Sequence, residues 1–347
     1  MSTITKNPLV DQVQIPIEIL KRGNDFYVAS LITSRTYFRD PFFIDSLAKI
    51  LPGIKSQIKL PEEDELLARP VHFDEDDQRI VFTSLEEFIH QSINASLDRK
   101  LGFIFHMSRC GSTLVSQMLS TTDRFFVLSE PTIINAVLDP ALDISSDSRK
   151  SLLEAVVKSL LVCAPHESEL MFIKFRSWNT LFLETILTSF PNVPWIFVHR
   201  QGTEVLQSVL QKPPGWLRSK RRYSSHFSKI LAISQSRIER MDQEEYVTRL
   251  LATFCDVAYK HRSFRSVFLE YPDIKNSFVE LVEKLWDIKL SKDEIDSIHR
   301  TTKIYSKDTG KSVEFKSDSE TKQSIATDKQ VKLVGEFIEP IRLKLKS

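Results

Sequence analysis

"FIFHMSRCGSTLVSQML", residues Phe103 to Leu119, joins two apolar runs through a short turn of small polar residues. The first run predicts a strand buried on both faces, and the apolar residues of the second fall on one face of a predicted helix. A phosphate-binding loop is built this way, because the first N–H groups of the helix point at the anion. The lysine of the common loop G-x-x-x-x-G-K-[ST] is missing, and Arg109 stands two residues before Gly111 instead.

Composition places the chain among ordinary globular proteins. It has 347 residues, of which 27% are charged and 41% are apolar, and this length can bury a sizeable core. The net charge of +1 leaves no global basic field of the kind that non-specific nucleic-acid binders carry. We therefore expect no nucleic-acid partner, and any anion site must be local.

The sequence predicts neither a membrane span nor a secretion signal. No apolar run approaches the roughly 20 residues that cross a bilayer, and the N-terminal stretch MSTITKNPLVDQVQ has no apolar core. Cys110, Cys163 and Cys255 are too few and too widely spaced to predict a disulfide framework or a zinc site. We expect a cytoplasmic protein that does not contact the membrane.

From Leu101 onward, predicted strands and helices alternate. Near-continuous apolar runs predict the strands, and segments with a period of 3.6 residues between them predict helices. The predicted strands are residues 101–107, 124–130, 169–175, 193–199 and 265–271. This order predicts an α/β fold, an open parallel sheet flanked by helices on both faces. We expect the main domain at 99–347, with an N-terminal extension of mixed structure at 1–98 packing on it.

Polar and charged residues follow four of the predicted strands. They are Ser108 to Thr113, Glu130, Lys174 with Arg176, and Arg200. In open α/β sheets, ligands bind beyond the carboxyl ends of the strands. We therefore expect these residues to contribute to one site.

The first of these loops, 108–113, has the residue types that an anion requires. Arg109 carries a planar, permanently charged guanidinium that suits a tetrahedral oxyanion. Gly111 allows the backbone to come close to a ligand. Cys110, Ser112 and Thr113 contribute backbone N–H groups, and the last two add hydroxyls, at a predicted helix N-terminus. Alone, the same pattern also fits an ordinary Ser/Thr-capped helix start.

A second candidate anion site lies in WIFVHRQGTEVLQSVL, residues 195–210. A predicted strand ends at Arg200, and Ser208 follows eight residues later on the next predicted helix. The start of that helix and both side chains can gather around another phosphate. Alone, a surface arginine and a helix-face serine also explain this pattern.

Together, MSRCGSTL and the Arg200–Ser208 pair resemble the two phosphate motifs of the PAPS-dependent sulfotransferase superfamily, and more closely those of its tyrosylprotein-type branch. Residues 268–295, FLEYPDIKNSFVELVEKLWDIKLSKDEI, are similar in pattern to a third block of that family. The resemblance implies a P-loop NTPase-like sulfotransferase fold from Leu101 to the C-terminal helix. It implies that PAPS (3′-phosphoadenosine-5′-phosphosulfate) is the donor and 3′,5′-ADP the product. The loop 109–113 would hold the 5′-phosphosulfate, and Arg200 with Ser208 the 3′-phosphate.

The resemblance also implies catalytic roles. In the tyrosylprotein branch a glutamate lies twenty-one residues past the loop arginine; Glu130 has this place relative to Arg109 and would take the proton of the acceptor. Lys174 matches a lysine that meets the transferring group. Where the small-molecule branch has a basic histidine, this chain has Arg176, which cannot act as a base at neutral pH. Arg109 and Lys174 would stabilise the charge of an in-line displacement, for which no metal is required.

Two basic segments are further candidates. Arg218 to Lys229, RSKRRYSSHFSK, could cover the donor or steer an acidic acceptor, although a solvated loop explains it as well. The lysine-rich segment from Tyr305 to Lys322 includes Lys307 and Lys316. The resemblance implies that a basic C-terminal loop of this kind closes over the nucleotide.

Two other functions remain open. A P-loop kinase or other phosphotransferase is one, although the loop lacks its lysine and WIFVHR ends without an aspartate for Mg²⁺. The other is a non-catalytic member of the fold that binds a nucleotide or a partner. If Glu130 is only structural, His106 and His199 are the next candidates for the base. The sequence predicts an acceptor with a hydroxyl or an amine, a small molecule or a peptide, but neither its identity nor the oligomeric state.

Overall fold

The computed structural model describes residues 12–34, 40–52, 54, 74–93, 99–218, 220, 224–302 and 319–346. The chain forms two compact units: a first unit of Met1–Lys100 with Asp123–Met171, and a second unit of Leu101–Thr122 with Phe172–Ser347. The expected extension, 1–98, falls within the first unit, which also contains 123–171. A main domain that spans the whole of 99–347 therefore stays a prediction.

The described strands form two sheets. They are Gln12–Arg22 (β1), Asp25–Ser34 (β2), Ile80–Ser84 (β3), Lys100–His106 (β4), Phe125–Ser129 (β5), Leu170–Lys174 (β6), Trp195–His199 (β7) and Ser266–Glu270 (β8). One sheet has the order β1-β2-β3 and the other β5-β6-β4-β7-β8. β7 pairs in parallel with both β4 and β8, which places Phe103 opposite Trp195 and His199 opposite Glu270. The second sheet consists of the five predicted strands, so the α/β fold class is confirmed.

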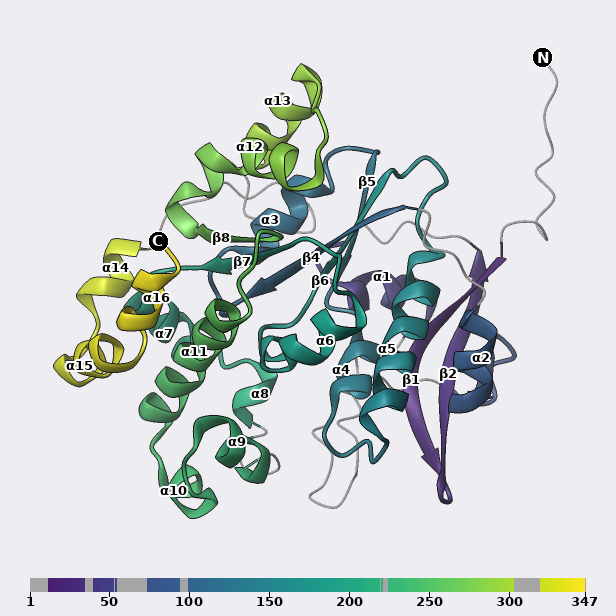
Figure 1. Ribbon diagram of the computed structural model, residues 1–347, viewed down its shortest axis with the longest axis horizontal. Coiled ribbons are helices and arrows are strands. Elements are labelled where there is room, and N and C mark those ends of the chain that lie inside the picture. The colour runs from purple at the N-terminus through teal and green to yellow at the C-terminus, as the bar shows by residue number, and fades with distance from the viewer. Residues whose placement is uncertain are drawn as a thin grey trace. The chain divides into compact units, whose positions relative to one another are not determined.

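The first unit contains the antiparallel sheet. β1 and β2 form a hairpin that turns at Gly23, whose φ of +63° lies in the left-handed region that favours glycine. Val13, Ile15, Ile17 and Ile19 of β1 are buried. Figure 1 shows the helices of this unit, which are Phe43–Ile50 (α1), Leu85–Ile93 (α2), Thr132–Leu138 (α4) and Ser146–Leu161 (α5). α4 and α5 pack on β1, and α2 packs on β2 and β3, so this sheet has a core of its own.

The second unit has an aromatic core between its strands and helices. The Phe105 ring stacks on Phe175, with 4.6 Å between centroids, and meets Trp195 edge-on at 5.8 Å. The helices of this unit are Ser112–Leu119 (α3), Leu183–Ser189 (α6), Gly202–Gln211 (α7), Gly215–Arg218 (α8), Ser224–Leu231 (α9), Gln235–Arg240 (α10), Gln243–Lys260 (α11), Ile274–Trp286 (α12), Lys292–Thr301 (α13), Ser319–Ser324 (α14), Asp328–Phe337 (α15) and Glu339–Lys344 (α16). None of the described helices is long and apolar enough to cross a membrane.

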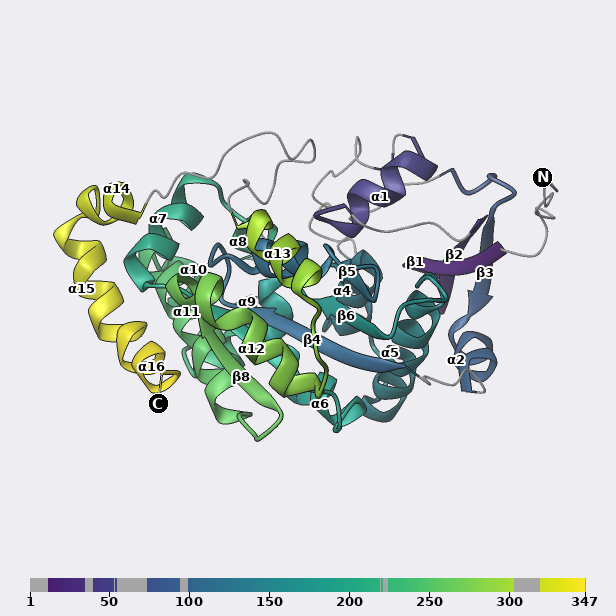
Figure 2. The same cartoon turned by 90° about the horizontal axis from the view of Figure 1, so that it is seen from above.

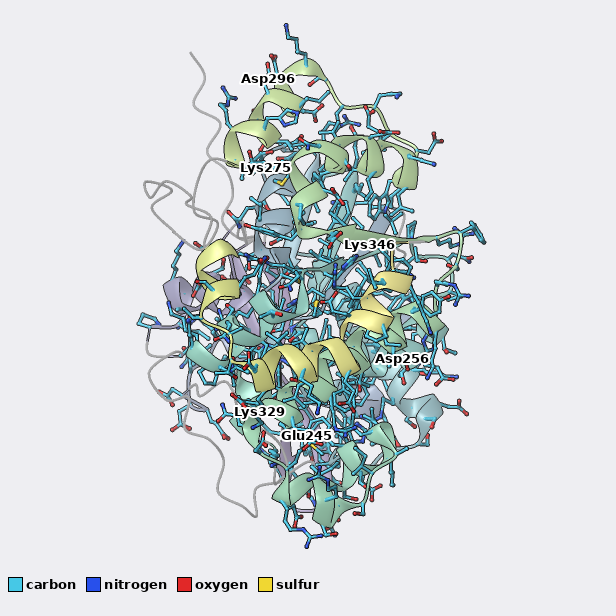
Figure 3. The ribbon with its side chains drawn as sticks, turned by 90° about the vertical axis from the view of Figure 1, so that its left-hand side faces the viewer. Glu245, Asp256, Lys275, Asp296, Lys329 and Lys346 are labelled. Atoms are coloured by element: carbon cyan, nitrogen blue, oxygen red, sulfur yellow. The ribbon has the colours of Figure 1, made fainter. Side chains whose placement is uncertain are left out.

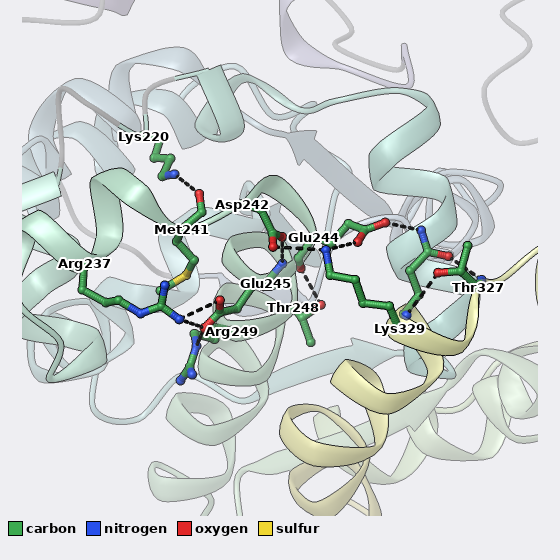
Figure 4. A network of polar contacts seen from close by, with 11 residues as sticks. Lys220, Arg237, Met241, Asp242, Glu244, Glu245, Thr248, Arg249, Thr327 and Lys329 are labelled. Carbon is green, nitrogen blue, oxygen red and sulfur yellow. Dashed lines mark hydrogen bonds and ion pairs between the residues drawn. The ribbon is translucent and has the colours of Figure 1, made fainter.

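The three C-terminal helices pack on the helix that follows Arg200. α14 and α15 contact α7, and α15 and α16 contact α11, as the yellow ribbon in Figure 2 shows. Polar contacts fasten α15 to the start of α11: Lys329 Nζ lies 2.7 Å from Glu244 Oε2 and 3.1 Å from Asp242 Oδ2 (Figure 4). Figure 3 labels Lys329 at the start of α15 and Lys346 just beyond the end of α16.

Candidate functional site

The loop between β4 and α3 is a tight turn with an unusual backbone conformation. Ser108, Arg109 and Gly111 all have positive φ, at 82°, 48° and 97°. Gly111 is the residue before the first turn of α3, and a Cβ at this position would lie 2.6 Å from Cδ2 of Tyr271. Glycine is therefore required here for its φ and for the close approach of an aromatic ring. Positive φ at two non-glycine residues is strain that proteins concentrate at functional sites.

The N-terminus of α3 offers hydrogen-bond donors to a ligand. No side chain caps this helix start. The side chains of Ser108, Ser112 and Thr113 are buried, yet among the described residues none of their hydroxyls has a hydrogen-bond partner. Because the first N–H groups of a helix have no partner within it, they and these hydroxyls form a polar cradle that suits an anion.

Lys174 and Arg200 bring positive charge to this loop. Lys174 ends β6 and is fully buried, and Arg200, directly after β7, is 6% exposed. Both charges act on the Cys110 thiol in the direction of a lower pKa, which places them near the loop. Burial prevails and raises the pKa of Cys110 to about 12, so the thiol stays neutral and donates to the Val198 carbonyl over 3.0 Å. The structure thus brings together the loop, Lys174 and Arg200, and their role as one binding site stays a prediction.

The Arg200 guanidinium is held on two sides. Its Nε donates to the Glu204 carboxylate one helical turn away. Its plane lies over the Tyr271 ring, with Cζ 4.1 Å from the centroid. Tyr271 also lies against Gly111, so one aromatic ring contacts both predicted anion motifs. The sequence analysis did not identify Tyr271 or Glu204, although the i, i+4 spacing of Glu204 from Arg200 was a readable signal.

The N-terminus of α7 differs from the expectation that it would be open to a phosphate. The Gly202 N–H donates to Glu339 Oε1 over 2.9 Å, and the Glu204 N–H donates to the Gln201 side chain over 3.0 Å. A carboxylate of α15–α16 therefore satisfies the first turn of α7, as the helix dipole favours. Ser208, two turns along α7, is half-buried, and its hydroxyl has no partner among the described residues.

Arg109 does not point back into its own loop. Its Nη2 donates to the Lys212 carbonyl over 2.7 Å, one turn beyond Ser208. Arg109 is therefore tied to the C-terminal end of α7, and Arg200 lies before its N-terminal end. The two predicted motifs contact the same helix.

A cavity of about 350 Å³ lies between the segment that follows α7 and the start of α11. Its lining residues are Pro213, Leu217, Lys220, Gln243 and Tyr246. Pro213 directly follows the Lys212 carbonyl that Arg109 binds. Lys220, from the predicted basic segment 218–229, donates to the Met241 carbonyl over 2.5 Å (Figure 4). It also lies 5.2 Å from the Tyr246 ring centroid. This lysine therefore belongs to the cavity wall.

Glu130 lies in the first unit, directly after β5. It is half-buried, and its φ of 59° is unusual for a glutamate. Such an outlier is typical of functional positions. Its role as a base stays a prediction. Lys307 and Lys316 lie outside the described residues.

Of the two histidines, His106 is fully engaged in structural contacts. Its Nδ1 accepts the Ser108 N–H over 3.1 Å, and its Nε2 lies 3.1 Å from the Phe175 carbonyl, to which it donates. A neutral ring with both nitrogens bound fastens the loop to the end of β6. No nitrogen is left to accept the proton of an acceptor, which argues against His106 as a base.

His199 is 1% exposed, and its Nδ1 has no hydrogen-bond partner among the described residues. Burial lowers its pKa to about 4; Glu270 acts in the opposite direction, and the nearby cations Arg342 and Lys346 lower it further. The imidazole is therefore neutral in the folded protein at neutral pH.

The lowered pKa of His199 leads us to expect that the protein is less stable in mild acid. The unfolded chain takes up the proton below pH 6.5, but the folded protein does so only near pH 4, so the free energy of unfolding falls as the pH drops through this window. We expect His199 to account for about 2 kcal/mol of loss between pH 7 and pH 5. Urea unfolding at both pH values measures it, and His199→Gln should remove that share of the loss. An unchanged difference in the variant would contradict the assignment.

Comparisons with protein-family models and with curated proteins find no match. Solved structures do match. Sulfotransferase STF9 from Mycobacterium avium is 13% identical, with a TM-score of 0.41 over 70% of this chain and 79% of that one. The sulfotransferase domain of the Synechococcus PCC 7002 olefin synthase is 13% identical, with a TM-score of 0.37 over 70% and 97%. Retinol dehydratase, in complex with retinol and PAP, is 15% identical, with a TM-score of 0.36 over 77% and 87%. Two of these solved structures carry the name of the family that the two motifs resemble.

Proposed function

We propose that this protein is a sulfotransferase that moves a sulfuryl group from PAPS to an acceptor hydroxyl or amine. One observation supports the proposal most strongly: the uncapped N-terminus of α3 lies close to two buried cations, Lys174 and Arg200. Ser108, Ser112 and Thr113, at the start of α3, are largely buried residues whose hydroxyls have no partner in the described part of the chain, and Lys174 and Arg200 lie close to the same loop. An anion would supply the charge and the hydrogen-bond acceptors that this arrangement requires.

The residues fit the two anionic ends of the donor. The α3 cradle, with Ser112 and Thr113, suits the 5′-phosphosulfate. Arg200 is permanently charged, and Glu204 and Tyr271 fix its orientation before a ligand arrives. With Ser208 on the same helix, it suits a 3′-phosphate.

The transfer then follows as an in-line displacement. When bound, PAPS supplies the activated sulfuryl group. The acceptor oxygen forms a bond to sulfur, the bond from sulfur to the bridging phosphate oxygen breaks, and 3′,5′-ADP leaves. Glu130 takes the proton of the acceptor, and Lys174 offsets the charge that develops on the sulfuryl and bridging oxygens.

The cavity between the segment after α7 and the start of α11 suits a small acceptor. It combines apolar walls from Pro213 and Leu217 with polar groups from Lys220 and Gln243, as pockets for small molecules do. An acceptor there would lie close to the peptide that holds Arg109.

Replacing Arg200 with alanine tests the donor. We expect the wild type to bind 3′,5′-ADP more tightly than 5′-AMP, and Arg200→Ala to lose most of that difference, about 1.5–3 kcal/mol for a charge-assisted contact. Isothermal titration with both nucleotides measures it.

Arg249→Ala is the matched control. Arg249 also pairs with a carboxylate four residues away and also lies 4.1 Å over an aromatic ring, that of Phe337. It should retain the wild-type preference. Equal binding of both nucleotides by the wild type would contradict the proposed donor.

A further inference from the structure

Three charged residues at the C-terminal end of the chain, Glu339, Arg342 and Lys346, lie on one face of α16 and its last turn. They are spaced three and four residues apart, which aligns them on a helix. Arg342 Nη2 lies 2.6 Å from Glu339 Oε2, and Arg342 is itself only 6% exposed. We call these three residues the C-terminal latch.

The latch holds the two segments that carry the residues of the proposed 3′-phosphate site. Glu339 accepts the N–H of Gly202, two residues after Arg200. Arg342 pairs with Glu270 Oε1, and Lys346 Nζ lies 2.6 Å from Glu270 Oε2, so both oxygens of the residue before Tyr271 are engaged. The start of α7 and the end of β8 are thereby fixed by one short helix.

Tyr271 connects the latch to loop 108–113 because its ring contacts both Arg200 and Gly111. Its ring lies under the Arg200 guanidinium, and its edge lies so close to Gly111 that a Cβ there would be 2.6 Å away. A shift of Tyr271 would therefore move Arg200, the loop, or both, because neither contact leaves spare room.

We infer that the C-terminal latch is a positioning device for the nucleotide site, and that it sets the orientation of Arg200 through Gly202 and Tyr271. This inference rests on the proposed function, because it assigns the preference for a 3′-phosphate to residues that do not touch the nucleotide. Buried ion pairs often contribute little net stability, but they impose a defined geometry. If the latch had no positioning role, mutating it would lower the stability of the protein but leave the nucleotide preference unchanged.

The experiment compares Arg342→Met and Lys346→Met in the full-length chain. Arg342→Met should lower the preference for 3′,5′-ADP over 5′-AMP by about tenfold, within the range for residues coupled through one salt-bridge network. Lys346→Met removes one partly exposed partner, with little risk to folding, and should lower the preference by about twofold. Lys344→Met is the control: Lys344 lies on the same helix, 5.9 Å from the Tyr259 ring centroid, and should change nothing.

A loss of stability without a positioning role would weaken both nucleotides equally and leave their ratio intact. Amide hydrogen exchange of the unliganded proteins gives a second readout. In Arg342→Met it should become faster in peptides 200–206 and 268–274 but not in 280–286. If Arg342→Met kept both the wild-type ratio of affinities for 3′,5′-ADP and 5′-AMP and the wild-type rate of amide hydrogen exchange, the positioning role of the latch would be wrong. The proposed function would still stand. A wild type without any preference would instead contradict the proposed function, and exchange alone would then decide the latch.

Discussion

Replacing Glu130 with glutamine is expected to lower turnover by about 10²–10⁴-fold, the usual contribution of a positioned base. Glutamine keeps the size of the side chain and the strain of the positive φ, but it cannot take a proton. The affinity for 3′,5′-ADP should stay unchanged, because a base that faces the acceptor does not hold the nucleotide. Acceptor-dependent formation of 3′,5′-ADP from PAPS, with a panel of small hydroxyl compounds, measures turnover.

Glu154→Gln is the control for this variant. Glu154 is a half-buried glutamate on α5 of the same unit, and its replacement should leave turnover intact. A bell-shaped pH profile of the wild type should lose its acidic limb in Glu130→Gln, which a purely structural carboxylate would not cause. Full turnover in Glu130→Gln would show that the base lies elsewhere.

Replacing Lys174 with methionine should lower turnover by about 10²–10³-fold, comparable to the loss of one donor that stabilises developing charge. Methionine has a similar length but no charge. Lys174 is fully buried, so the variant is checked for folding as well as for activity. The turnover assay measures the loss, and thermal melting shows that the variant protein is folded.

The donor should also bind more weakly to Lys174→Met, because the ammonium contacts the sulfuryl group both before and during transfer. Lys284→Met is a control that removes an exposed lysine near the end of α12. If Lys174→Met retained full turnover, the buried charge would be structural and the proposed electrostatic role would be wrong.

The five-stranded sheet could be predicted because four of its strands, β4 to β7, are buried on both faces. Such strands read as continuous apolar runs, and the helices between them have a clear period, so "LGFIFHM" and "WIFVH" identify β4 and β7. The hairpin of β1 and β2 was missed, although the alternation of Val13, Ile15, Ile17 and Ile19 before Gly23 was a readable signal. Pro16, the buried Glu18 and a register shift between them interrupt the alternation of apolar and polar residues.

The anion loop could be predicted because its parts are adjacent in the sequence. Arg109 to Thr113 form one local unit, and the ends of parallel strands place Lys174 and Arg200 at the same edge. The contacts that orient them could not be predicted. Tyr271 and Glu339 reach the site through the packing of β8 and α16, which no local pattern encodes. The contact of Arg109 with the Lys212 carbonyl is likewise long-range.

Calorimetric titration of the wild-type protein with 3′,5′-ADP, and separately with ATP and Mg²⁺, tests the central claim most directly. A 3′-phosphorylated nucleotide carries an anionic group at each end. The α3 cradle with Lys174 suits the 5′ end, and Arg200 with Ser208 suits the 3′-phosphate. The account predicts that 3′,5′-ADP binds at least about tenfold more tightly than ATP with Mg²⁺, a difference of about 1.4 kcal/mol. Tighter binding of ATP with Mg²⁺ would contradict the account and favour a phosphotransferase.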